Sequence, residues 1–295
     1  MHTESPRPAR LWGDMFNSIR VQGILPEELV VLVEKVVPLL AQARSEAVIA
    51  LPEADACASV EAMFAGSPLL LRQDFPFDEP QALKLTQPLL DLLEKTSGEA
   101  AKATQALRQA LESGRLDLPQ LFRAYAAGDD APFTPWRDRL PGSPRALDFL
   151  ATSALWPGLN TAAELLAKRL PEGLPHDHGH CPLCGSLPYI SLLRGKEGKR
   201  FGVCSFCGHE YRIRRIACAY CDEADQNRLK LFQVAEYPGL RVDVCESCKM
   251  YIKTVDAREG VAGAMPALDD MASVALDAVA QRQGYKRPTL SAWGF

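Results

Sequence analysis

The chain has 295 residues, of which 47% are hydrophobic and 24% are charged, and its net charge at pH 7 is −4. This composition is typical of a globular protein with one large domain or two to three smaller ones. The negative net charge argues against a general attraction to nucleic acid or membrane surfaces. The sequence contains no apolar run suited to a signal peptide or a membrane span, so we expect a cytoplasmic protein with reduced cysteines.

The first half of the chain has a helical pattern. Residues 1–25 mix prolines with charges, and we expect a flexible N-terminus there. After Pro26, apolar residues recur at three-to-four spacing, which predicts a helix with a buried face, and Pro38 predicts its kink or end near Val37. Further helices are predicted at 53–65, 80–96, 99–113, 118–127 and 145–170, between turn-forming clusters. We therefore predict an all-helical domain over residues 26–175.

Beyond residue 170 the pattern changes to short strands. Strands are predicted at 187–193, 200–203, 210–216, 229–235 and 240–244, and an alanine-rich segment predicts a helix over 264–280. His176, His178 and His180 alternate in a Pro- and Gly-rich stretch that we interpret as a solvated linker. The expected fold class is therefore α+β and multidomain. The helical domain is followed by two tandem rubredoxin- or zinc-ribbon-like β modules, at 176–216 and 217–260, and then by a C-terminal helix and tail at 261–295.

Eight of the nine cysteines form four CxxC pairs. They are Cys181/Cys184, Cys204/Cys207, Cys218/Cys221 and Cys245/Cys248. Two intervening residues let a tight turn, or knuckle, present both thiolates to one ion, so one knuckle supplies half of a tetrahedral site. Four such pairs within 68 residues indicate two metal ions per chain. The 19-residue and 23-residue gaps suit a hairpin between two knuckles, which favours sequential pairing over cross-braced or nested pairing.

Four sulfur ligands suit zinc or a single rubredoxin-type iron, and the sequence leaves both metals open. The simplest interpretation is that both ions stabilise modules too small to have a sufficient core. With four protein ligands, no position is left for a hydrolytic water. The sequence also lacks a Gly-rich nucleotide loop, a Ser-His-Asp pattern and an HExxH motif, so we do not expect an enzyme.

A cluster of basic residues is a candidate surface for an acidic partner. It consists of Lys199, Arg200, Arg212, Arg214 and Arg215. Residues 181–260 contain 13 Lys and Arg against 10 Asp and Glu. Two four-thiolate sites with divalent ions would offset this small excess, which disfavours a zinc-ribbon nucleic-acid binder. That function and rubredoxin-like electron transfer or redox sensing remain the alternatives to protein binding.

The cysteine-rich part resembles the formate dehydrogenase accessory (formation) proteins. The resemblance rests on Cys181-Pro-Leu-Cys-Gly-Ser-Leu-Pro188, Cys204-Ser-Phe-Cys207, Arg214-Arg-Ile-Ala-Cys-Ala-Tyr-Cys221 and Cys245-Glu-Ser-Cys-Lys-Met-Tyr-Ile-Lys253, and covers residues 145–256. The resemblance implies a cytoplasmic protein that binds the catalytic subunit of respiratory formate dehydrogenase during maturation and is needed for its activity. It also implies rubredoxin-like modules that can hold iron. J-domain co-chaperones also carry four CxxC pairs, but their CxxCxGxG repeat is absent here.

Overall fold

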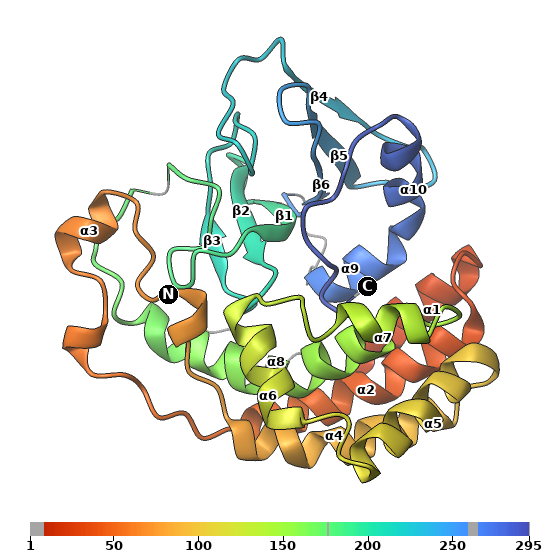
Figure 1. Cartoon of the computed structure of the whole chain (residues 1–295). Helices are drawn as coiled ribbons and strands as arrows, with labels where there is room; N and C mark the ends of the chain where they lie inside the picture. Colours follow the sequence, from red (N-terminus) through yellow and green to blue (C-terminus); the bar gives the residue numbers. More distant parts are fainter. Residues whose placement is uncertain (1–8, 176, 259–264, 295) are drawn as a thin grey trace.

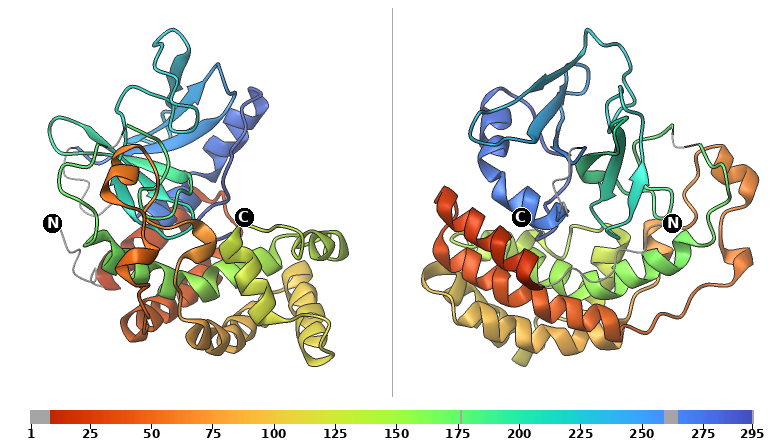
Figure 2. Two further views of the ribbon diagram at one scale, coloured as in Figure 1. Left: turned by 60° about the vertical axis from the view of Figure 1, so that its left-hand side comes forward. Right: turned by 180° about the vertical axis from the view of Figure 1, so that it is seen from behind.

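The computed structural model of the chain describes residues 9–175, 177–258 and 265–294. Most helices from the first half form one layer, and a β-sheet with two further helices lies on that layer (Figures 1 and 2). The first-half helices are α1 (Ala9–Gln22), α2 (Glu27–Glu46), α3 (Val60–Phe64), α4 (Glu79–Glu94), α5 (Gly98–Glu112), α6 (Leu118–Ala127), α7 (Thr134–Arg139) and α8 (Ala146–Ala167), with short 3₁₀ turns η1 (Ala54–Ala56) and η2 (Arg72–Asp74). The predicted fold class is confirmed.

The helix α8 lies at the centre of the helical layer. It packs against α2, α4, α5 and α6, and most of its residues are buried. The neighbouring helices instead bury a single apolar stripe, as surface helices of a globular domain do. Asp78 and Asp117 cap α4 and α6 by accepting hydrogen bonds from the backbone amides of Gln81 and Gln120.

The expected irregular N-terminus is wrong, and of the two alternatives given for Pro38 the helix end is excluded. Residues 9–22 form the helix α1, with Phe16 and Ile19 buried, while residues 1–8 lie outside the described residues. The helix α2 does not end near Val37 but continues through Pro38 to Glu46. The buried side chains of Leu40 and Ala43 extend its apolar face beyond the proline, and their burial outweighs the hydrogen bond that the proline removes.

The strands form one six-stranded sheet rather than two separate ones. They are β1 (Pro188–Arg194), β2 (Lys199–Cys204), β3 (Glu210–Arg212), β4 (Leu229–Phe232), β5 (Leu240–Cys245) and β6 (Tyr251–Asp256), in the order β3-β2-β1-β6-β5-β4. Each half is an antiparallel meander, and the parallel pair β1–β6 joins the halves, with Ile190 opposite Lys253. The central strand β6 was not predicted.

The predicted C-terminal helix is two short helices, α9 (Pro266–Ala272) and α10 (Val274–Arg282), which break at Ser273. Residue 264, where the helix was expected to begin, lies outside the described residues. Leu276 and Ala280 of α10 pack on Val242, Val244 and Tyr251 of the sheet. The two helices thus cover one face of the β4–β6 half (Figure 1).

Candidate metal centres

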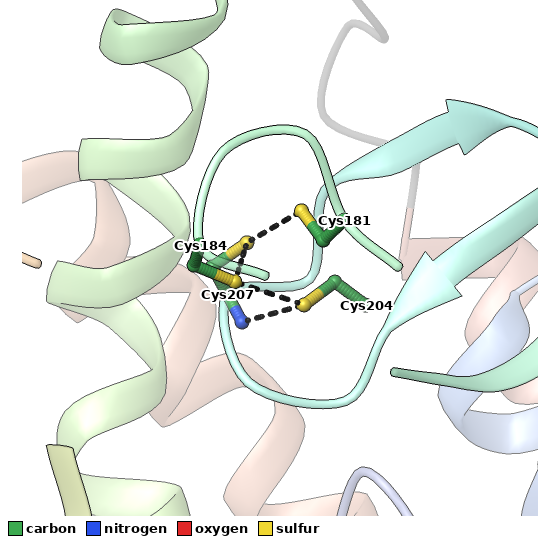
Figure 3. A group of neighbouring side chains, drawn as sticks. All are labelled: Cys181, Cys184, Cys204 and Cys207. Atoms are coloured by element: carbon green, nitrogen blue, oxygen red, sulfur yellow. Dashed lines mark hydrogen bonds between the residues drawn. The ribbon is translucent and has the colours of Figure 1, made fainter. Parts of the chain in front are cut away.

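The first two knuckles bring four sulfurs together. Cys181, Cys184, Cys204 and Cys207 point toward a common centre (Figure 3), and their sulfur atoms all lie within 4.8 Å of one another. The Sγ–Sγ distances are 3.4 Å between Cys184 and Cys204, 3.7 Å between Cys184 and Cys207, and 3.8 Å between Cys181 and Cys207. A tetrahedron with metal–sulfur bonds of about 2.3 Å has edges of about 3.8 Å, so this group can hold one ion.

The other two knuckles form a second group of the same kind. Cys218 and Cys248 have their sulfurs 3.7 Å apart, as do Cys221 and Cys245, and all four sulfurs lie within 4.8 Å of one another. The expected sequential grouping of the knuckles is therefore confirmed. The nine cysteines are all free thiols rather than disulfides.

All four knuckles have the same backbone geometry. In each, the amide of the first cysteine donates to the carbonyl five residues later, at 2.8 to 3.0 Å. The amide four residues after the first cysteine donates back to that cysteine's carbonyl, at 2.8 to 3.2 Å. The amides of Phe206 and Cys207 also donate to the sulfur of Cys204, and the amide of Tyr220 donates to that of Cys218. Amides aimed at sulfur temper the charge of a thiolate ligand, which is the role of outer contacts in a metal site.

The residue that follows each knuckle has a positive φ. It is Gly185 and Gly208 in the first group, with φ of +73° and +71°. In the second group it is Asp222 and Lys249, both with φ of +57°, a conformation that costs a side-chain-bearing residue free energy. A lysine held in this conformation indicates that closure of the knuckle outweighs local backbone preference.

The thiols of the first group are deeply buried. Burial raises the pKa of Cys181 and Cys207 well above the ordinary value, because a thiolate is poorly solvated in the interior. Burial and the neighbouring sulfurs likewise raise the pKa of Tyr211, whose hydroxyl donates to the Gly179 carbonyl at 2.6 Å. Four buried thiolates therefore require a cation among them, and the residues present fit a divalent or trivalent metal ion.

The helical layer encloses the first group. The amides of Leu69 and Leu70 donate to the carbonyls of Pro182 and Leu183 in the first knuckle, at 2.8 and 3.0 Å. On the second knuckle, the ring of Phe206 packs edge-on against Phe75 with centroids 5.6 Å apart. Asn160 of α8 donates to the Cys207 carbonyl at 3.3 Å.

The second group is more open, because Cys221 is exposed and Cys248 is half-buried. The first site is thus part of the main core, whereas the second borders solvent.

The basic residues predicted to bind a partner differ in exposure. Lys199, Arg212, Arg214 and Arg215 are exposed, but Arg200 is only 3% exposed. Its guanidinium donates to Ser191 Oγ at 3.2 Å and to the Ala217 carbonyl at 3.0 Å, and pairs with Asp243 at 3.1 Å. The prediction for Arg200 is corrected, because its charge is neutralised in the interior and cannot face a partner.

A buried ionic cluster fastens the C-terminal helices to the sheet. Lys253 Nζ lies 2.8 Å from an Asp270 carboxylate oxygen and 2.6 Å from an Asp277 oxygen, and Arg287 pairs with the same two carboxylates at 2.8 and 3.3 Å. The hydroxyl of Tyr251 donates to Asp277 at 2.8 Å. The sequence pattern did not predict this cluster. The signal for it was Lys253 itself, a charge inside an otherwise apolar run.

His178 and His180 are not part of either sulfur group. Their rings stack with centroids 5.1 Å apart, and His180 Nε2 lies 2.8 Å from the Gly66 carbonyl. His176 lies outside the described residues. Over the described ranges, none of the helices has the length and apolar character that crossing a membrane requires.

Comparison with known proteins identifies similar chains. Two family domains described as FdhE, central domain, and FdhE, C-terminal domain, match residues 180–215 and 216–293. A protein FdhE homolog of Aquifex aeolicus is 31% identical over 228 residues, which cover 75% of this chain and 72% of the relative. Protein FdhE of Escherichia coli is 24% identical over 80% of this chain and 72% of its own length.

A solved structure has the same fold. The crystal structure of the FdhE protein from Pseudomonas aeruginosa matches with a TM-score of 0.64 at 23% identity, over 98% of this chain and 97% of that one.

Proposed function

Because this chain belongs to the FdhE family, we propose that it is a metal-binding accessory protein that binds the catalytic subunit of a respiratory formate dehydrogenase and is needed for that enzyme's activity. The observation that carries the proposal is the pair of four-sulfur groups, each built by two knuckles of one shape. Such sites fix the backbone around them rigidly, which suits recognition of another protein. Action in the cytoplasm, before the subunit is exported, belongs to the same proposal.

The eight cysteines would hold two ions, either zinc or iron. The ion supplies the positive charge that four buried thiolates need, and iron would add one-electron redox chemistry. The chain's own residues close the knuckles, direct amides to the sulfurs and enclose the first site within the helical layer. With four cysteines around each ion, no open position remains for a substrate, which favours a binding role over catalysis.

Exposure of Cys221 favours a second candidate, electron transfer or redox sensing at the second site. Visible absorption that disappears reversibly on reduction, together with an identified electron donor, would support this second candidate. Two colourless zinc ions per chain would rule it out.

The test begins in the native host. A strain lacking this chain should lose respiratory formate dehydrogenase activity, and the wild-type gene should restore it. The protein, purified without oxygen, should carry two metal ions and retain the catalytic subunit. Full formate dehydrogenase activity in the deletion strain, together with no association between the purified proteins, would contradict the proposal.

Variants of the ligands sharpen the test. Cys184→Ser and Cys245→Ser should each remove one metal ion and abolish both complementation and binding. Cys57→Ser is the matched control, because Cys57 belongs to neither sulfur group, and it should behave as wild type.

A further inference from the structure

A groove lies beside the second sulfur group, on the sheet face opposite α10. It has a volume of about 410 Å³. Leu231, Asp243 and Ile252 are in register across β4, β5 and β6, so their side chains share this face and form its floor. The connection that follows β3 forms its wall, with Ala217, Cys218 and Tyr220 among the residues that line it.

The edges of the groove, called its lips below, are apolar and exposed. The side chains of Ile216 and Leu231 are 57% and 54% exposed, and both line the groove. Ile216 comes from the connection and Leu231 from the end strand of the sheet, so two separate segments present apolar surface to the same space. A bound segment that covers these two side chains would remove apolar surface from water, which favours binding.

Basic side chains outnumber acidic ones in the groove lining. Arg200, Arg215, Lys230 and Arg241 line it, against one acidic residue, Asp243. Asp243 already lies 3.1 Å from Arg200 and 3.0 Å from Arg241. Arg215 donates to the neutral carbonyl of Glu197, which leaves its charge uncompensated by that contact. Lys230 pairs with Glu246 outside the lining, at 3.5 Å, so Arg215 and the excess of Arg200 and Arg241 over Asp243 supply the positive charge of the groove.

We propose that this groove, defined by Ile216, Leu231, Arg215 and Arg241 around Asp243, binds a peptide segment of the client subunit in which apolar residues are flanked by aspartate or glutamate. The inference rests on the proposed function and adds the surface and the chemistry of the segment. The apolar lips receive the apolar side chains, and the guanidinium groups receive the carboxylates. A basic segment is excluded by the same charges.

The groove also depends on the second sulfur group. Cys218 and Cys245 belong to its lining, and Arg200 holds the carbonyl of Ala217, the residue before Cys218. The wall is therefore in place only when the knuckles are closed. Loss of the second metal should weaken client binding more strongly than substitution of one lip residue.

The experiment measures binding of the full-length metal-loaded chain to the purified catalytic subunit. Ile216→Asp and Leu231→Asp should each weaken binding at least about tenfold. Leu71→Asp, at a residue 58% exposed and outside the groove lining, is the matched control and should bind as wild type. Arg215→Glu should weaken binding and reduce its salt dependence, whereas Lys35→Glu, an exposed charge in α2, should not.

Peptides spanning the subunit identify the segment. Those that bind should be apolar and acidic, and should lose affinity when their carboxylates are converted to amides. Binding by basic peptides, or equal binding by wild type, Ile216→Asp and Leu231→Asp, would overturn the proposed role of the groove. Either result would leave the proposed function of the chain intact. Failure of wild type to bind the subunit would instead contradict the proposed function.

A second copy of this chain is the competing occupant. If wild type is a dimer in sedimentation equilibrium and Leu231→Asp converts it to a monomer, the groove is a self-association surface and the peptide proposal fails. A monomeric wild type, with hydrogen-exchange protection of residues 215–231 on addition of the subunit, is the expected result.

Discussion

The Arg200 guanidinium on β2 lies 3.1 Å from a carboxylate oxygen of Asp243 on β5, across the two strands β1 and β6 that separate them in the sheet. Thr254 of β6 donates to the same carboxylate at 2.5 Å, and Ser191 of β1 lies 2.6 Å from Thr254. A continuous series of polar side-chain contacts thus connects four strands and both cysteine-containing halves of the sheet. The halves are joined by side chains as well as by the backbone ladder.

Arg200→Met should therefore destabilise the whole sheet. It removes the buried cation beside Asp243 and leaves the half-buried Arg241 as the remaining one, which we expect to lower the free energy of unfolding by about 3 kcal/mol. Urea denaturation followed by circular dichroism measures this loss. Arg212→Met, at an exposed arginine opposite Phe201, is the control and should change stability by less than about 0.5 kcal/mol. Equal stability of the two variants would contradict the role given to Arg200.

Lys253→Met should loosen the C-terminal helices. The substitution leaves the carboxylates of Asp270 and Asp277 buried with Arg287 as their remaining cation. We expect a loss of about 3–5 kcal/mol and faster hydrogen exchange in residues 266–282. Lys286→Met removes an exposed lysine nearby and serves as the control. Unchanged exchange in α9 and α10 of the Lys253 variant would show that the ionic cluster does not hold them.

The two metal ions should leave at different rates. Cys221 is exposed and Cys248 half-buried, whereas the first four cysteines are all buried, so a chelator has access to the second site only. With a colour-forming chelator in excess, we expect release in two phases of one ion each. Cys248→Ser should remove the fast phase, and Cys184→Ser should remove the slow one. A single phase that releases both ions would contradict this difference between the sites.

Acid should weaken one contact between α7 and the turn before it. A hydrogen bond from Arg137 lowers the pKa of Asp130 from its ordinary value of 3.8. Because the folded pKa lies below the unfolded one, the stabilisation is present above about pH 4 and is lost as pH falls through the folded value. The Asp130→Asn difference in unfolding free energy should shrink below about pH 4. It should stay below about 1 kcal/mol, since Asp130 is largely exposed.

The same substitution made in an Arg137→Met background checks this prediction. In Arg137→Met, the Asp130→Asn substitution should have no acid-dependent effect on the unfolding free energy. A persistent pH dependence in that background would assign the effect to another group.

The cysteine pattern allowed much of the fold and of the candidate sites to be predicted. Knuckle spacing is local, so the grouping of Cys181/Cys184 with Cys204/Cys207 follows from one hairpin-sized gap. Helices such as α4, α5 and α6 were predicted within two residues of their bounds, because each has an apolar stripe and a turn signal at its ends. The boundaries between domains remain a prediction.

Other features were missed for physical reasons. The helix α1 has Trp12, Phe16 and Ile19 at helical spacing, but the prolines before it obscured the pattern. The strand β6 contains Lys253, whose charge breaks an apolar run although its partners are buried with it. The burial of Arg200 depends on Asp243, which lies in the other half of the sheet, and sequence spacing does not report such pairs.

The parallel contact between β1 and β6 also constrains how the chain folds during synthesis. β1 leaves the ribosome with β2 and β3, but its other neighbour, β6, begins at Tyr251 and follows two further strands. Until then the apolar edge of β1 has no sheet partner, which is a state open to wrong pairing. Early capture of a metal ion by the first two knuckles would hold that half in shape while the rest of the chain is made.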